Sequence, residues 1–173
     1  MASCSSLRIL YLNGNHIGLS GVIEFFTELV KSILSDQCEE ETKVKASRKK
    51  KKGNKKEKDP ALPISYDMFA ISLQSNDVHI MDRALDVKCI EFIEYFCNYL
   101  KLAKDLQWLN FFGNEISTFG AQSIISALTE RSKTIKNKKQ KKVFLEITPH
   151  FSSSLYDQLI KLTGKNKPKL RLK

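Results

Sequence analysis

The chain has 173 residues, of which 42% are hydrophobic, and it carries 29 basic and 19 acidic side chains for a net charge of +10. This composition is sufficient for one packed core, no apolar run approaches the length of a membrane span, and there is no signal-peptide pattern or N-x-S/T acceptor. These features argue against membrane insertion and predict one intracellular, cytoplasmic domain over residues 1–173.

The first predicted element is a short strand followed by a turn and a helix. In "LRILYLNGNHIGLSGV", Leu10 and Leu12 alternate with Tyr11 and other non-core residues, as in a strand with one buried face. Asn15 follows where the strand ends, and its side-chain amide can satisfy backbone groups without a ladder partner. Beyond this turn the apolar spacing becomes helical, which predicts a first unit near residues 7–40.

The same pattern recurs along the chain. In "FAISLQSNDV" the apolar pair and the asparagine stand 61 residues after those of the first unit, which predicts a second unit near residues 65–102. "LQWLNFFGNEISTFGA" matches the first unit at an offset of 99 and predicts a third unit near residues 106–130. A degenerate fourth unit near residues 143–164 has an inward pair of aliphatic residues and places His150 where asparagine is expected, and the terminal "KLRLK" suggests a fifth strand.

The motif L-x-x-L-x-L-x-x-N-x-I followed by a helix resembles the leucine-rich-repeat family, and among its types the ribonuclease-inhibitor-like one. The resemblance is carried by residues 7–34 and 106–130. It implies an α/β fold, a short irregular solenoid with a parallel sheet on the concave side and helices on the convex side. One unit cannot bury its own apolar face, so neighbouring units are expected to share one core.

Two lysine-rich stretches separate a helix from the next strand, residues 43–60 and 131–142. Both are predicted to be low-complexity loops, because they have too few apolar residues to offset the entropy of ordering. Residues 43–58 and 131–142 hold 17 of the 29 basic residues and one of the 19 acidic ones, which leaves 12 basic and 18 acidic residues elsewhere. The positive charge therefore belongs to disordered basic insertions, and not to a folded basic face.

Two interpretations of the first lysine-rich stretch remain open. One is a solvated insertion without a partner. The other is electrostatic attachment to an acidic surface or RNA, or nuclear import through "SRKKKKGNKKEK". The residues that would make such contacts are Lys49, Lys50, Lys51, Lys52, Lys55 and Lys56.

The residues that alternate with the inward leucines are expected to line the concave sheet in three rows. The first row is Ile9, Ala70, Trp108 and Phe144, the second is Tyr11, Ser72, Asn110 and Glu146, and the third is Asn13, Gln74, Phe112 and Thr148. Aromatic side chains at solvent-facing positions are typical of a protein contact. The competing interpretation shifts some strands by one residue and places aromatics in the core. The predicted partner-binding residues are Ile9, Tyr11, Trp108, Asn110, Phe112, Phe144 and Glu146.

Catalytic and metal-binding patterns are not evident in the sequence. The four cysteines (Cys4, Cys38, Cys89 and Cys97) form no C-x-x-C pair, and the three histidines form no ligand pair at helical spacing. We find no nucleophile with a partner and no phosphate-binding glycine loop. We therefore expect a protein that is not an enzyme and uses no metal, cofactor or small molecule.

The predicted function is a protein–protein interaction or scaffold subunit of a larger intracellular assembly. Such a subunit would bind through the concave sheet face and the open ends of the repeat array, possible partners being other leucine-rich-repeat or cytoskeletal subunits. Two alternatives use the lysine-rich loops: a cytoskeletal or ciliary component that docks on the acidic surface of tubulin, and a nuclear or RNA-associated factor.

Overall fold

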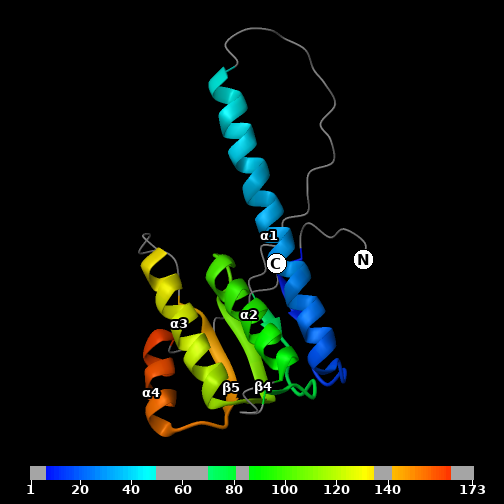
Figure 1. Cartoon of the computed structure of the whole chain (residues 1–173), viewed down its shortest axis with the longest axis vertical. Helices are drawn as coiled ribbons and strands as arrows, with labels where there is room; N and C mark the ends of the chain where they lie inside the picture. Colours follow the sequence, from blue (N-terminus) through cyan, green and yellow to red (C-terminus); the bar gives the residue numbers. More distant parts are fainter. Residues whose placement is uncertain (1–6, 50–69, 81–85, 135–141, 165–173) are drawn as a thin grey trace.

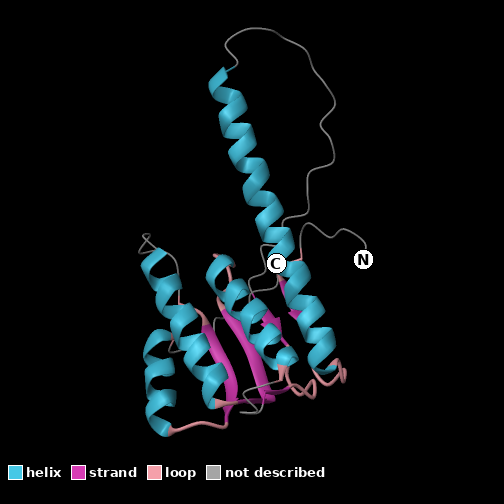
Figure 2. Cartoon of the chain, in the orientation of Figure 1, coloured by secondary structure: helices cyan, strands magenta, loops and turns pink. Residues whose placement is uncertain are grey.

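The computed structural model describes residues 7–49, 70–80, 86–134 and 142–164. Within them the elements are β1 (Ile9–Tyr11), α1 (Gly18–Lys49), β2 (Ala70–Ser72), β3 (His79–Ile80), α2 (Val87–Leu102), β4 (Trp108–Ile116), α3 (Thr118–Thr134), β5 (Phe144–Pro149) and α4 (Ser153–Leu162). Figure 1 and Figure 2 show the strands in one layer, with the helices against one face of it. The chain is therefore an α/β protein.

The strands form one parallel sheet. β1, β2, β4 and β5 neighbour one another in chain order, and the two-residue β3 pairs with the end of β4 beyond β2. Leu10 lies opposite Ile71, Ile71 opposite Leu109, and Leu109 opposite Leu145. The prediction of a single parallel sheet in chain order is confirmed, whereas β3 was not predicted.

The helices pack side by side in chain order, α1 on α2, α2 on α3 and α3 on α4. Helices α1, α2 and α3 each lie between two strands of the sheet, as parallel pairing requires, and α4 follows β5. Helices α2, α3 and α4 each begin after a residue whose side chain caps the helix. Ser117, before α3, accepts a hydrogen bond from the backbone N–H of Gly120 at 3.3 Å. Asp86 accepts a hydrogen bond from the backbone N–H of Lys88 at 3.0 Å, and Ser152 accepts one from Leu155 at 3.4 Å.

The core lies between the helices and the sheet and is rich in aromatic rings. Phe26 on α1 meets Phe96 on α2 edge to face at 5.1 Å, and Phe92 stacks on Phe111 of β4 at 5.7 Å. Rings in these arrangements contribute about 0.5–1.5 kcal/mol each beyond the area they bury. The inward positions of β2 and β4 are fully buried, as the sequence predicted: Ile71, Leu73, Leu109 and Phe111.

Helix α1 is longer than predicted. It has 32 residues and continues through Lys49, so the prediction of a loop over 43–60 is wrong for 43–49. The sequence explains the extension, because this part is rich in Glu, Lys, Ala and Arg, which favour helices, and Glu39 and Glu41 precede lysines by four residues. Figure 1 shows this end of α1 projecting beyond the sheet and the other helices. Residues 50–60 lie outside the described residues.

Helix α3 likewise extends into the second predicted loop, so residues 131–134 are helical and not low-complexity loop. Arg131 is 3% exposed and its guanidinium is used structurally. It donates hydrogen bonds of 2.6–3.2 Å to the carbonyl oxygens of Leu100, Ala103, Lys104 and Leu106. Burial lowers the pKa of Arg131, and Tyr99 and Asp105 oppose that shift. This cation holds the end of α2 and the turn into β4. Residues 135–141 lie outside the described residues.

Candidate functional site

The sheet face opposite the helices, here called the helix-free face, carries the first two predicted rows. Strand register places Ile9, Ala70, Trp108 and Phe144 opposite one another, and Tyr11, Ser72, Asn110 and Glu146 opposite one another. Because side chains alternate along a strand and the intervening residues join the core, both rows face away from the helices. The register of these rows is as predicted.

Trp108 departs from the expectation of a solvent-facing aromatic. Its side chain is 1% exposed, and Ala70 beside it is fully buried, although neither residue is part of the core between sheet and helices. The ring of Tyr11 meets the indole edge to face at 5.7 Å, and the indole N–H donates to Glu146 Oε2 at 2.9 Å. The prediction that Trp108 faces solvent is therefore wrong: it is buried on the helix-free face. Ile9 and Phe144 in its row are half-buried.

The second row is a network of hydrogen bonds with one exposed ring. Tyr11 is 55% exposed, whereas Ser72 is buried and Asn110 is 6% exposed. The Ser72 hydroxyl donates to Asn13 Oδ1 at 2.6 Å, and Asn110 Nδ2 donates to Gln74 Oε1 at 3.3 Å. These bonds link β1, β2 and β4 across two rows and fix their side chains. The Asn110 side chain is thus held by hydrogen bonds within the sheet. Tyr11 is the most exposed side chain of this row, and Glu146 is partly exposed.

Phe112 is the second exposed aromatic on this face. Its ring is 52% exposed, and its backbone N–H donates to Asn110 Oδ1 at 3.0 Å. The next residue, Gly113, has a φ of +75°, and a Cβ there would collide with the Ser75 hydroxyl. Both the backbone angle and the space therefore require glycine. This turn sets the position of Phe112.

The predicted third row is wrong at its last member, Thr148. β4 contains a bulge, so Phe111 pairs with Ile147 but the next paired residue, Glu115, already lies opposite Thr148. Thr148 therefore does not face Phe112 across the sheet. Its hydroxyl instead accepts a hydrogen bond from the backbone N–H of the bulge glycine at 2.7 Å. The sequence alignment assumed a constant offset and so missed the bulge.

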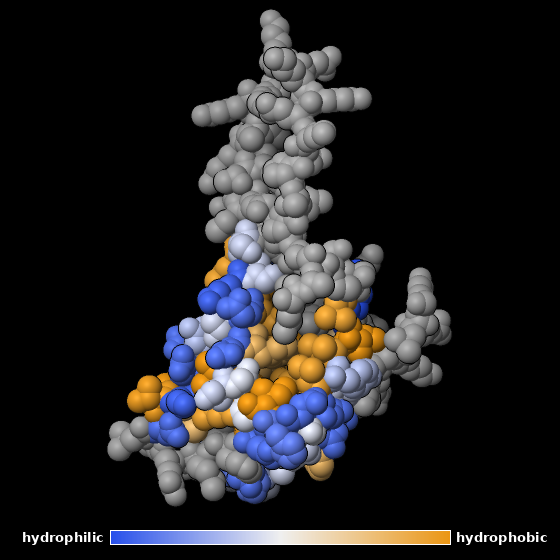
Figure 3. Space-filling view, turned by 90° about the vertical axis from the view of Figure 1, so that its right-hand side faces the viewer, coloured by the Kyte–Doolittle hydropathy of each residue, from blue (hydrophilic) through white to orange (hydrophobic). Residues whose placement is uncertain are grey.

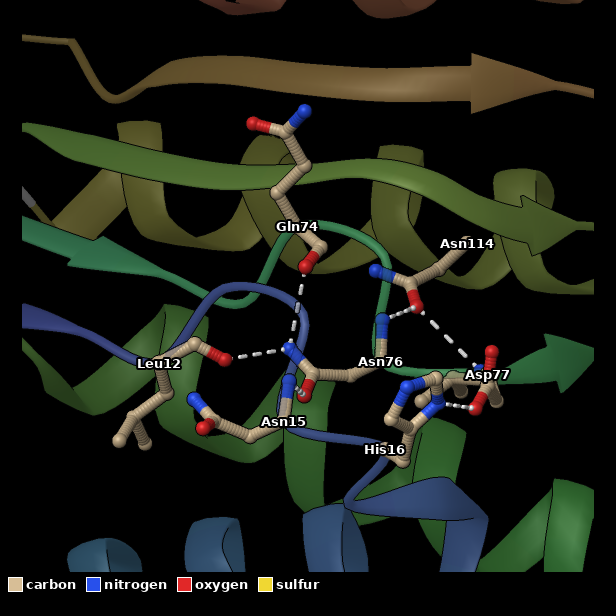
Figure 4. A network of polar contacts seen from close by, with 8 residues as sticks. Leu12, Asn15, His16, Gln74, Asn76, Asp77 and Asn114 are labelled. Carbon is tan, nitrogen blue, oxygen red and sulfur yellow. Dashed lines mark hydrogen bonds and ion pairs between the residues drawn. The ribbon is translucent and has the colours of Figure 1, made fainter.

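Asparagines form a ladder where the strands end (Figure 4). Asn76 accepts a hydrogen bond from the backbone N–H of Asn15 at 3.2 Å and donates to the Leu12 carbonyl at 2.8 Å. Asn114 repeats both bonds one strand further on, accepting from Asn76 at 2.9 Å and donating to the Leu73 carbonyl at 2.7 Å. Asn76 and Asn114 are fully buried. Their predicted role in satisfying turn backbone groups is confirmed.

Two pairs of histidine and carboxylate side chains follow the ladder. His16 Nδ1 lies 2.5 Å from Asp77 Oδ2, and His150 Nε2 lies 3.9 Å from Glu115 Oε1. His16 and Asp77 both have positive φ values, 50° and 58°. The first pair was not predicted, although the two residues stand 61 apart, which is the offset between the first two units. His150 was predicted at the asparagine position, and the bulge places it beside Glu115 instead.

The predicted lysine contacts lie mostly outside the described residues. Lys49 is the last residue of α1, so it is helical and not part of a loop. Lys50, Lys51, Lys52, Lys55 and Lys56 fall in the undescribed range 50–69.

The described part of the chain gives two observations that bear on metal and thiol chemistry. No group of three or more His, Cys, Asp or Glu side chains there could hold a metal ion. Cys89 and Cys97 are buried, and burial raises the pKa of Cys97 to about 12, which opposes thiolate formation. No helix in the described ranges is long and apolar enough to cross a membrane.

Comparison of the chain with protein-family models, with curated proteins and with solved structures produced no match.

Proposed function

We propose that this chain is a leucine-rich-repeat protein of irregular form that acts as a non-enzymatic, intracellular binding or scaffold subunit. Three observations support the repeat interpretation: strand registers that reproduce the sequence offsets, helices that stack in chain order, and the asparagine ladder. Such an array presents one sheet face free of its own helices. In this proposal that face binds a protein partner.

The observation that carries the binding proposal is the pair of exposed aromatic rings on the helix-free face. Tyr11 and Phe112 are each more than half exposed, whereas the amides between them are held by hydrogen bonds. Aromatic side chains on a rigid support are the commonest energetic centres of protein interfaces. Trp108 supports Tyr11 from below and acts through it, because its own ring is buried.

The test compares matched aromatic substitutions. The intact chain, a Tyr11→Ser/Phe112→Ser variant and a Tyr156→Ser variant are used to capture partners from the native cell extract, with identification by mass spectrometry. Tyr156 is the control because it is 38% exposed but lies on α4, on the helical side. We expect proteins that are captured by the intact chain and the control but not by the double variant. Identical capture by all three would refute the proposal.

A second candidate function uses the projecting end of α1. Residues 36–49 extend about 20 Å at about 1.5 Å per residue, and residues 43–49 carry four basic side chains and no acidic ones. The basic tip of this arm, residues 43–49, held away from the rest of the fold, suits attachment to tubulin or RNA. Deletion of residues 43–58 should abolish sedimentation with microtubules, or RNA binding in a filter assay, at low salt. If the intact chain binds neither, this alternative fails.

A further inference from the structure

The outermost strand of the sheet is incompletely covered. Among the described residues β1 pairs only with β2. Leu10 and Leu12 are partly exposed, although Ile71 and Leu73, which hold the same positions in the next strand, are fully buried. Figure 3 views the molecule from this side and shows hydrophobic atoms gathered between hydrophilic margins. Among the described residues, the core is therefore less completely covered at β1 than at β2.

The backbone of β1 is also available for further pairing. Leu12 N–H donates to Ser72 at 2.8 Å, so the peptide groups of the even-numbered residues face β2. Alternate peptide groups of a strand point in opposite directions, which places the N–H and C=O groups of Ile9 and Tyr11 on the outer side. Within the described residues these groups have no strand beside them. They form an edge that can accept another strand.

Asn15 identifies what kind of strand fits this edge. Each of the other two ladder asparagines accepts a bond from the backbone of the preceding unit and donates to its carbonyl. Among the described residues the Asn15 side chain bonds only within its own turn, to the Asn13 carbonyl at 3.3 Å, and it is exposed. The two bonds between units are absent among the described residues. Asn15 thus presents the donor and the acceptor that elsewhere in the chain hold a neighbouring unit.

We propose that the β1 edge, defined as Ile9, Leu10, Tyr11, Leu12 and Asn15, binds a strand of a leucine-rich-repeat unit carried by a second polypeptide, parallel to β1. This inference rests on the proposed repeat nature of the chain. The incoming strand pairs with the outer peptide groups of β1 and covers the two leucines with alternate aliphatic side chains. Its turn supplies a carbonyl to Asn15 Nδ2 and a backbone N–H to Asn15 Oδ1.

Two occupants of the β1 edge can be compared: a parallel repeat strand, and the β1 of a second copy of this chain related by two-fold symmetry. The contacts between the units within this chain favour the parallel repeat strand. The two bonds made by each ladder asparagine require a partner that runs in the same direction, with its turn at the same end of the sheet. A symmetric β1–β1 contact is antiparallel and brings no turn to Asn15. A parallel repeat strand satisfies the edge, the leucines and the amide together.

The test titrates the full-length, ¹⁵N-labelled chain with a synthetic peptide of residues 7–17, the repeat strand and turn of this chain. We expect chemical-shift changes at the backbone amides of Ile9, Tyr11 and Asn15, and not at those of β5. A spin label at the amino end of the peptide should broaden the signals of Leu7 and Arg8 if pairing is parallel. Broadening at Asn15 instead, or no shift changes at about 1 mM peptide, where even weak binding is detectable, would overturn the proposal.

Variants separate specific recognition from adhesion to an apolar edge. Asn15→Ala should weaken peptide binding about tenfold through the loss of two hydrogen bonds, and Glu24→Ala, an exposed change on α1, should not. Because Asn15 is exposed, the variant should keep the melting temperature of the parent. Equal binding by both variants would show that the amide does not select the strand. The result is independent of partner capture by Tyr11 and Phe112, since both variants keep those side chains.

Discussion

Replacement of Trp108 by alanine should strongly destabilise the chain. The indole is 1% exposed, so folding removes about 200 Å² of its surface from water, worth up to about 5 kcal/mol at about 25 cal/mol per Å². Truncation also leaves a cavity beneath Tyr11 and removes the hydrogen bond to Glu146. We expect a loss of about 3–5 kcal/mol. The Trp108→Phe variant keeps an aromatic ring, and because Glu146 is partly exposed and can hydrate, it should lose about 1–2 kcal/mol.

The measurement is equilibrium unfolding in urea, followed by circular dichroism, with midpoint and slope fitted separately for each variant. Phe112→Ala is the matched control, since it truncates an aromatic side chain of the same face that is 52% exposed, and it should change stability by about 0.5 kcal/mol or less. A Trp108→Ala loss below about 1 kcal/mol would refute the burial argument. It would restore Trp108 as a solvent-facing candidate for partner contact.

Three further predictions follow from buried polar groups. Asn114→Ala should lower the free energy of unfolding by about 3 kcal/mol, because it leaves buried backbone groups of the turns unpaired. Asn15→Ala should lower it by about 0.5 kcal/mol or less. Thermal unfolding of both variants tests this contrast. Arg131→Met should lower the free energy of unfolding, measured by urea titration, by about 3 kcal/mol. Arg131→Lys should restore little of that loss, because one ammonium cannot reach all the carbonyls that the guanidinium binds. Burial raises the pKa of Cys97 from 9.0 to about 12, so the folded state holds this proton more tightly. The contribution of the protonated Cys97 to the free energy of unfolding is complete below pH 9 and falls as pH rises toward 12. In urea titrations, the Cys97→Ala variant should therefore lose less unfolding free energy than the parent between about pH 8 and pH 10.5.

The sheet could be predicted from the sequence because its strands are specified by the spacing of apolar residues within and between the units. A period of two around Leu10 and Leu12, repeated at a fixed offset, determines both which side chains face inward and which strands neighbour one another. The register of Ile71 with Leu109 followed directly from those offsets. The asparagine positions were also predictable, because a turn after a short strand leaves backbone groups that need a side-chain partner.

Other features depended on interactions that spacing does not encode. The bulge after Phe111 is an insertion of three residues relative to β5, and a constant offset cannot represent it. Arg131 was assigned to a basic loop by composition, although its neighbours place it over the carbonyls that end α2. Trp108 was expected to be exposed because its strand position alternates with the core, but burial on the second face of a sheet depends on what lies over that face. Alternation determines the face and leaves the exposure undetermined.

The ladder shows how one residue type acquires different roles along a repeated motif. Asn76 and Asn114 are buried and bond the unit before them, so their amides contribute to stability and are closed to any partner. Asn15 has the same chemistry but stands at the outer strand, where it is exposed and lacks those bonds within the described residues. A buried asparagine amide without a hydrogen-bond partner costs free energy. At the exposed edge the same amide is hydrated, and it can exchange that water for the backbone groups of a partner. In our proposal, the interface that holds the units of this chain together is also the one through which the β1 edge binds another protein.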